Sequence, residues 1–108
     1  MKSMQIYIKA TNLDLTPALK EYVEEKVGGL ATYLSKWESD GAVKTRVEIA
    51  RTTNHHKKGD VFLATIDLHL PGKTLRAEET EWDARIAIDR ARDTMQREIV
   101  KYKETHAG

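Results

Sequence analysis

The chain has 108 residues, of which 40% are hydrophobic and 32% are charged, and it contains no cysteine. This length suits one small domain, and the composition is that of a folded chain rather than a disordered one. The lack of cysteine excludes disulfides, thiolate zinc sites and cysteine nucleophiles. No apolar run approaches the roughly 18 residues of a membrane span, and polar residues interrupt the N-terminal segment. We therefore expect a cytoplasmic protein with no signal peptide and no membrane segment.

The first third of the chain predicts a strand and a helix. Residues 4–10 alternate between apolar and polar side chains, which is typical of a half-buried strand with Tyr7 on its polar face. Thr16 suits the N-cap of a helix, and Pro17 suits its first position, where the missing N–H costs nothing. Apolar residues then recur at helical spacing, so the helix is expected to end near Trp37.

Three further strands are predicted in the middle of the chain. Residues 43–52 and 61–70 alternate, and the polar segment 53–60 reads as the loop between them. Residues 70–73, with the sequence LPGK, fit a type II turn because proline and glycine occupy its two central positions. The turn leads into a strand over residues 74–80.

The last element is predicted to be the longest helix. The segment from Thr80 to Asp83 resembles a capping box, and the helix is expected to run to about Lys103. Its apolar stripe is formed by Ala84, Ile88, Ala91, Met95, Ile99 and Tyr102.

The predicted order is therefore β-α-β-β-β-α. Each helix has one apolar stripe and each strand has one apolar face. A four-stranded sheet with two helices on one face buries all of them. We expect an α+β fold in a single domain spanning residues 1–108, with an ordered core from about 4 to 103.

The sequence offers little evidence for metal binding or catalysis. His55, His56, His69 and His106 form the only candidate metal cluster, and no cysteine or carboxylate lies at a recognised zinc spacing. There is no glycine-rich phosphate loop, nucleophile elbow or HExxH motif. We expect no metal, no cofactor, no small-molecule substrate and no enzymatic activity.

The charge is nearly balanced overall, with a net value of +1, but it is segregated along the chain. Residues 43–58 hold five basic side chains against one acid, and residues 85–103 hold six against three. In the first segment, Arg51, Lys57 and Lys58 either bind phosphate or form a solvated hairpin loop, and the charges alone do not decide between these readings.

The basic residues of the last helix form two groups. On a helical wheel with 100° per residue, one group flanks the core stripe and the other faces solvent. The first group is Arg85, Arg92 and Lys103, and the second is Arg90, Arg97 and Lys101. Arg97 and Lys101 lie one turn apart, so both can contact one phosphate track. The alternative is that these side chains form ordinary i,i+4 ion pairs, Arg85 with Asp89 and Asp93 with Arg97.

The assembled pattern resembles the ribosome hibernation-promoting factors, also called ribosome-associated inhibitor or sigma-54 modulation proteins. The resemblance runs from about Met4 to Lys103 and rests on the element order together with short matching segments. These segments are residues 15–23 (LTPALKEYV), Lys26, Leu30, residues 87–89 (AID), residues 96–98 (QRE) and Lys101.

The resemblance implies a fold like that of the double-stranded-RNA-binding domain and a function without chemistry. Members of the family bind the small ribosomal subunit near the decoding centre, where they occlude messenger and transfer RNA and so inhibit translation. It also implies that Lys26, Arg97 and Lys101 contact ribosomal RNA, with Lys26 reaching out past the sheet edge. We expect the free protein to be a monomer. The alternative is a general RNA- or protein-binding module of the same fold.

The sequence also departs from the family pattern. Gly28-Gly29 replaces a polar or basic pair, Thr94 replaces a common lysine, and Arg85-Ile86 stands where an aromatic residue usually precedes the AID segment. Arg90 and Arg92 are expected to offset the lost charge. The chain ends where the short members of the family end, so we expect no additional C-terminal domain.

Overall fold

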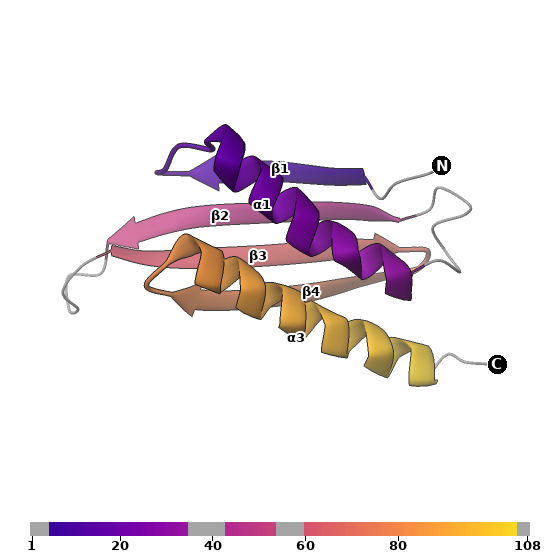
Figure 1. The fold of residues 1–108 in the computed structure, drawn as a ribbon. Coiled ribbons are helices and arrows are strands. Elements are labelled where there is room, and N and C mark those ends of the chain that lie inside the picture. The colour runs from indigo at the N-terminus through magenta and orange to yellow at the C-terminus, as the bar shows by residue number, and fades with distance from the viewer. Residues whose placement is uncertain (1–4, 35–42, 54–59, 106–108) are drawn as a thin grey trace.

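Four strands form one sheet, and two helices cover one of its faces (Figure 1). The computed structural model describes residues 5–34, 43–53 and 60–105. The sheet order is β1-β2-β3-β4, with β1 parallel to β2 and the other neighbouring pairs antiparallel. The elements are β1 (Gln5–Thr11), α1 (Pro17–Gly28), the 3-10 helix η1 (Gly29–Tyr33), β2 (Lys44–Thr53), β3 (Asp60–Leu70), β4 (Lys73–Glu81) and α3 (Ala84–Thr105). The predicted α+β fold and its element order are confirmed.

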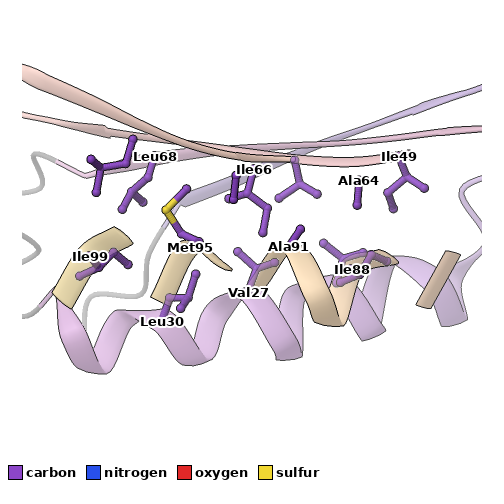
Figure 2. Close-up of a cluster of buried hydrophobic side chains, with 14 of the residues drawn as sticks. Val27, Leu30, Ile49, Ala64, Ile66, Leu68, Ile88, Ala91, Met95 and Ile99 are labelled. Carbon is purple, nitrogen blue, oxygen red and sulfur yellow. The ribbon is translucent and has the colours of Figure 1, made fainter. Parts of the chain in front are cut away.

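The hydrophobic core lies between the sheet and the two helices. Figure 2 shows Val27 and Leu30 from the first helical segment and Met95 from α3 pointing toward Ile66 and Leu68 of β3. All five side chains are fully buried. Burial of one such side chain contributes about 1.5–3 kcal/mol, so this layer fixes both helices on the sheet.

The first helix begins as predicted but ends earlier. The Thr16 hydroxyl accepts a hydrogen bond from the Leu19 N–H at 3.1 Å, which confirms the cap. The α-helix stops at Gly28 and continues as η1, so the expected helix to Trp37 is wrong over the described residues, and Trp37 itself lies outside them. Two consecutive glycines weaken the α-helix by about 1 kcal/mol each, which favours a tighter 3-10 ending. That ending still buries Leu30.

The start of α3 also differs from the prediction. Thr80 and Glu81 remain in β4, where they pair with Leu63 and Phe62 of β3. The cap is Asp83, whose Oδ1 accepts hydrogen bonds from the backbone N–H groups of Arg85 and Ile86 at 2.8 and 3.2 Å. The capping box predicted at Thr80 is therefore wrong, because the sheet ladder already holds that residue.

The remaining elements confirm the predicted pattern. Gly72 has a φ of 75°, as the second central position of a type II turn requires. Within the apolar stripe of α3, Ile88, Ala91, Met95 and Ile99 are fully buried. Over the described residues, neither helix is sufficiently long and apolar to cross a membrane.

Candidate nucleic-acid interface

The two groups of basic residues on α3 occupy different environments. Arg85, Arg92 and Lys103 lie on the side that faces α1 and η1. Arg90 lies against β4, and Arg97 and Lys101 extend from the exposed face. Arg90 thus has a different environment from Arg97 and Lys101, with which the wheel grouped it, because its partners come from β4, which the wheel does not contain.

Tyr22 organises the N-terminal end of the groove between the helices. Its hydroxyl donates a hydrogen bond to Asp89 Oδ1 at 2.7 Å. This hydrogen bond, partial burial and the nearby carboxylate charge together raise the pKa of Tyr22 to about 12. The Arg85 guanidinium lies 5.3 Å from the centroid of the Tyr22 ring, and the Lys26 ammonium lies 5.6 Å from it. Both distances are those of cation–π contacts.

Lys26 therefore does not lie where the sequence suggested. Its side chain is exposed beside α3 and its ammonium lies over the Tyr22 ring, so it does not extend past the sheet edge. Lys26 also lines an open hollow of about 490 Å³ between the two helices. The lining residues are Glu25, Lys26, Gly29, Asp89, Arg92 and Asp93, which carry both signs of charge.

Lys103 links α3 to η1, whereas the polar partners of Arg92 lie within α3. The Arg92 side chain is only 27% exposed and donates a hydrogen bond to Gln96 Oε1 at 2.7 Å. One of its guanidinium nitrogens lies 3.7 Å from the position that a Cβ on Gly29 would take. The Lys103 ammonium donates to the Tyr33 carbonyl oxygen at 3.1 Å. Arg92 and Lys103 both have hydrogen-bond partners within the protein, so they are less available to bind an external phosphate.

Arg90 is neutralised by the sheet. Its guanidinium pairs with Glu79 at 3.2 Å and with Glu81, both from the end of β4. The hydrogen bond to Glu81 and the two carboxylate charges raise the pKa of Arg90. The expectation that Arg90 offsets the charge missing from the family pattern is therefore weakened, because two carboxylates already balance it.

Thr94 explains one departure from the family pattern. Its hydroxyl donates to Glu79 Oε2 at 2.8 Å and accepts from the Arg97 guanidinium at 3.1 Å. The neutral Thr94 hydroxyl thus contacts both Glu79 of β4 and Arg97. Arg97 and Lys101 thus present two charges one helical turn apart.

The fold adds a basic residue that sequence reasoning missed. Lys73 begins β4, and it lies with Lys101 and Tyr102 around a hollow of about 240 Å³. Because α3 returns antiparallel to β4, its last turns lie beside the start of that strand. The topology could have revealed this neighbour, whereas the helical wheel alone could not. Arg97, Lys101 and Lys73 form the candidate interface.

The other basic region is separate. Arg51 is exposed near the end of β2, and its carbonyl accepts a hydrogen bond from Asn12 Nδ2 at 3.4 Å. Together with Asn12, Leu13 and Asp14 it lines a wide hollow of about 770 Å³. This end of β2 and the C-terminal end of α3 lie at opposite ends of the molecule (Figure 1). Lys57 and Lys58 lie outside the described residues.

The expected ion pairs along α3 and the candidate metal-ligating histidines can be compared with the structure. The i,i+4 ion pairs expected for Arg85 with Asp89 and for Asp93 with Arg97 do not form over the described residues. Asp89 instead accepts from Tyr22, and Asp93 pairs with Arg92 at 3.3 Å. Of the histidines, only His69 is described. Its Nδ1 lies 3.1 Å from the Thr74 hydroxyl on the sheet.

Comparison with known proteins gives a consistent result across sequence and structure. The model of the family described as Sigma 54 modulation protein / S30EA ribosomal protein matches residues 6–107. A ribosome hibernation promotion factor from Deinococcus radiodurans is 35% identical over 93% of this chain and 50% of its own length. A ribosome hibernation promoting factor from Azotobacter vinelandii is 33% identical over 94% of this chain and 84% of its own length.

A solved structure supports the same relationship. The crystal structure of the N-terminal domain of Protein Y from Thermus thermophilus is 31% identical, with a TM-score of 0.74. The match covers 92% of this chain and 99% of that domain. The chain spans about half the length of the relatives from Deinococcus radiodurans and Lactococcus lactis.

Proposed function

Because the chain belongs to the Sigma 54 modulation protein / S30EA ribosomal protein family, we propose that it acts as a ribosome hibernation factor. In this proposal it binds the small ribosomal subunit near the decoding centre. There it inhibits translation by occupying space that messenger and transfer RNA need. The family is one of ribosome-associated proteins rather than enzymes, which agrees with the sequence-based expectation of a non-catalytic domain.

The binding site is inferred from the exposed basic residues in the C-terminal half of α3. Arg97 and Lys101 are exposed on a helix of 22 residues, and Lys73, at the start of β4, lines the same hollow as Lys101 and Glu98. The Lys101 and Lys73 ammonium groups make no hydrogen bond or ion pair with the described residues. Positive side chains on a rigid support give phosphate contacts that do not depend on base sequence. A folded ribosomal RNA surface is recognised mainly through shape and such contacts.

The first turn of α3 disfavours free duplex RNA as the target. A duplex binder commonly uses a positive helix N-terminus to meet groove phosphates. Here Asp83 caps that terminus, and Glu81 precedes it by two residues. These carboxylates would repel phosphate, so the alternative of a general duplex-binding module receives no support from this end of the helix.

A ribosome-bound role places the protein in the cytoplasm, and we expect the free protein to be a monomer.

The test reverses the two exposed charges. The double variant Arg97→Glu with Lys101→Glu should bind small ribosomal subunits about a hundred-fold more weakly or worse, since two charge-assisted contacts are lost. Co-sedimentation at moderate salt measures the affinity, and the circular dichroism melting curve checks that the fold is intact.

The matched control exchanges the two residue types, Arg97→Lys with Lys101→Arg, and so preserves both charges. It should retain most of the binding, because phosphate contacts of this kind depend chiefly on charge. Wild-type affinity in the charge-reversed variant would contradict the assignment of the site to α3, although the family relationship would stand.

A further inference from the structure

The sheet face that carries no helix presents a second basic surface. Both helices lie on the other face (Figures 1 and 2), so the outward side chains of β1 and β2 are uncovered in this chain. Tyr7 of β1 pairs in register with Arg46 of β2, and Gln5 pairs with Lys44. Tyr7, Lys44 and Arg46 are all exposed, and Tyr7 is 54% exposed.

The acids of this face already have partners within the protein. Glu48 accepts a hydrogen bond from the Thr11 hydroxyl at 2.8 Å. Glu78 accepts from the Thr65 hydroxyl at 3.3 Å and also pairs with Arg76. Asp67 pairs with the same arginine at 3.5 Å. On β3 and β4 one arginine, Arg76, therefore pairs with two carboxylates, while Glu48 on β2 receives only a neutral hydroxyl.

The basic side chains of Lys9, Lys44 and Arg46, on β1 and β2, have no such partners among the described residues. Over the described residues, the Lys9 and Lys44 ammonium groups and the Arg46 guanidinium make no hydrogen bond or ion pair. Because Lys44 and Arg46 are two residues apart on one strand, their Cα atoms lie about 7 Å apart on the same face. Lys9, Lys44 and Arg46 outnumber Glu48, the acid on the same two strands, so this half of the sheet carries a net positive charge.

Two shallow hollows adjoin Tyr7, and both are lined by Tyr7 and Arg46. One hollow of about 310 Å³ is also lined by Lys9, Glu48 and Asp67, and another of about 330 Å³ is also lined by Lys44 and His69. An exposed aromatic ring with a cation on each side supplies the two contacts that an unpaired nucleotide needs. The base stacks on the ring and the flanking phosphates contact the cations.

We propose that this face binds a single-stranded RNA segment, with a base stacked on Tyr7 and phosphates held by Lys44 and Arg46. The surface, defined here as the Tyr7 strip, is separate from Arg97, Lys101 and Lys73 on the other side of the molecule. It therefore goes beyond the proposed hibernation role and does not depend on it. Specificity for unpaired RNA follows from the stacking contact, because bases inside a duplex keep their faces covered.

The test measures binding of a labelled oligouridine by fluorescence anisotropy with the whole chain. The Tyr7→Ser variant should bind about five-fold to a hundred-fold more weakly, and Tyr7→Phe, which keeps the ring, should bind like the wild type. The double variant Lys44→Gln with Arg46→Gln should lower the slope of log affinity against log salt by about 1.4, since two phosphate contacts on a single strand are lost.

The control for charge is Arg97→Gln with Lys101→Gln, which removes two cations from the helical face. It should leave oligouridine binding unchanged while weakening ribosome binding. Three outcomes would overturn the proposal: no binding of the wild type at low salt, equal loss in both double variants, or equal affinity for an RNA duplex of the same length. None of these outcomes bears on ribosome co-sedimentation, so the two proposals fail separately.

Discussion

Tyr22 links the two helices through a single polar contact. Its hydroxyl reaches Asp89 on α3, while the ring supports the cations of Lys26 and Arg85. A hydrogen bond to a carboxylate is stronger than one between neutral groups. The same bond raises the pKa of Tyr22, because ionised tyrosine can no longer donate and would face the Asp89 charge. This hydrogen bond therefore adds a polar link between α1 and α3 to the hydrophobic core that packs both helices on the sheet.

The Tyr22 contact should make stability depend on pH in the alkaline range. The folded pKa of about 12 exceeds the ordinary value of 10.0, so the folded state binds the phenolic proton more tightly than the unfolded chain. The contribution is complete below pH 10 and is lost as pH rises toward 12. We predict that Tyr22→Phe lowers the free energy of unfolding by about 1 kcal/mol near neutral pH, and by progressively less above pH 10.

Urea unfolding at several pH values measures this difference. Tyr33→Phe is the matched control, because the Tyr33 hydroxyl makes no hydrogen bond with the described residues and its carbonyl is unaffected. A difference between wild type and Tyr22→Phe that stays constant up to pH 12 would show that the hydroxyl contributes nothing through Asp89.

The junction between α1 and η1 is the clearest feature at the scale of elements. Gly28 has the helical values φ −59° and ψ −29°, and no atom outside its own helical turn lies within 4 Å of a Cβ built on it. Neither steric crowding nor a positive φ requires glycine there. Burial of Leu30 and Leu34 stabilises the 3-10 ending, and the low helix propensity of the glycine pair adds to it.

We predict that Gly28→Ala raises the free energy of unfolding by about 0.4–1 kcal/mol, because alanine reduces the entropy of the unfolded chain and favours the helix. Gly72→Ala is the contrasting variant. It should lower stability, since the φ of 75° at Gly72 is strained for alanine. Chemical denaturation measures both variants, and a destabilised Gly28→Ala protein would refute this view of the junction.

The helix boundaries could not all be predicted from the sequence alone. Periodicity identified both helices and all four strands, because each element has one apolar face and the two periods differ. The start of α3 was missed since Thr80 is a good cap in isolation, yet its place in the ladder with Leu63 is decided by β3. The end of α1 was missed because a glycine pair weakens an α-helix without revealing which geometry replaces it.

At the scale of the whole molecule, tertiary partners decide which cations remain available. Arg90 and Arg97 lie within about 20° of each other on the helical wheel. Nevertheless, Arg90 is neutralised by β4, whereas Arg97 donates to the neutral Thr94 hydroxyl. The sequence supplied Arg97 and Lys101 correctly as exposed residues, but the proximity of Lys73 follows from the packing of α3 beside β4, and the neighbours of Tyr7 follow from the sheet register. The near-zero net charge thus conceals two positive surfaces on opposite sides of one small fold.

The most direct test of this account is co-sedimentation of the purified protein with separated small and large ribosomal subunits across a salt series. We predict binding to the small subunit alone, weakening as salt rises because phosphate contacts release counterions. Binding should be lost when messenger RNA and initiator transfer RNA already occupy the subunit. No binding to the small subunit at low salt, or equal binding to an occupied subunit, would contradict the hibernation mechanism.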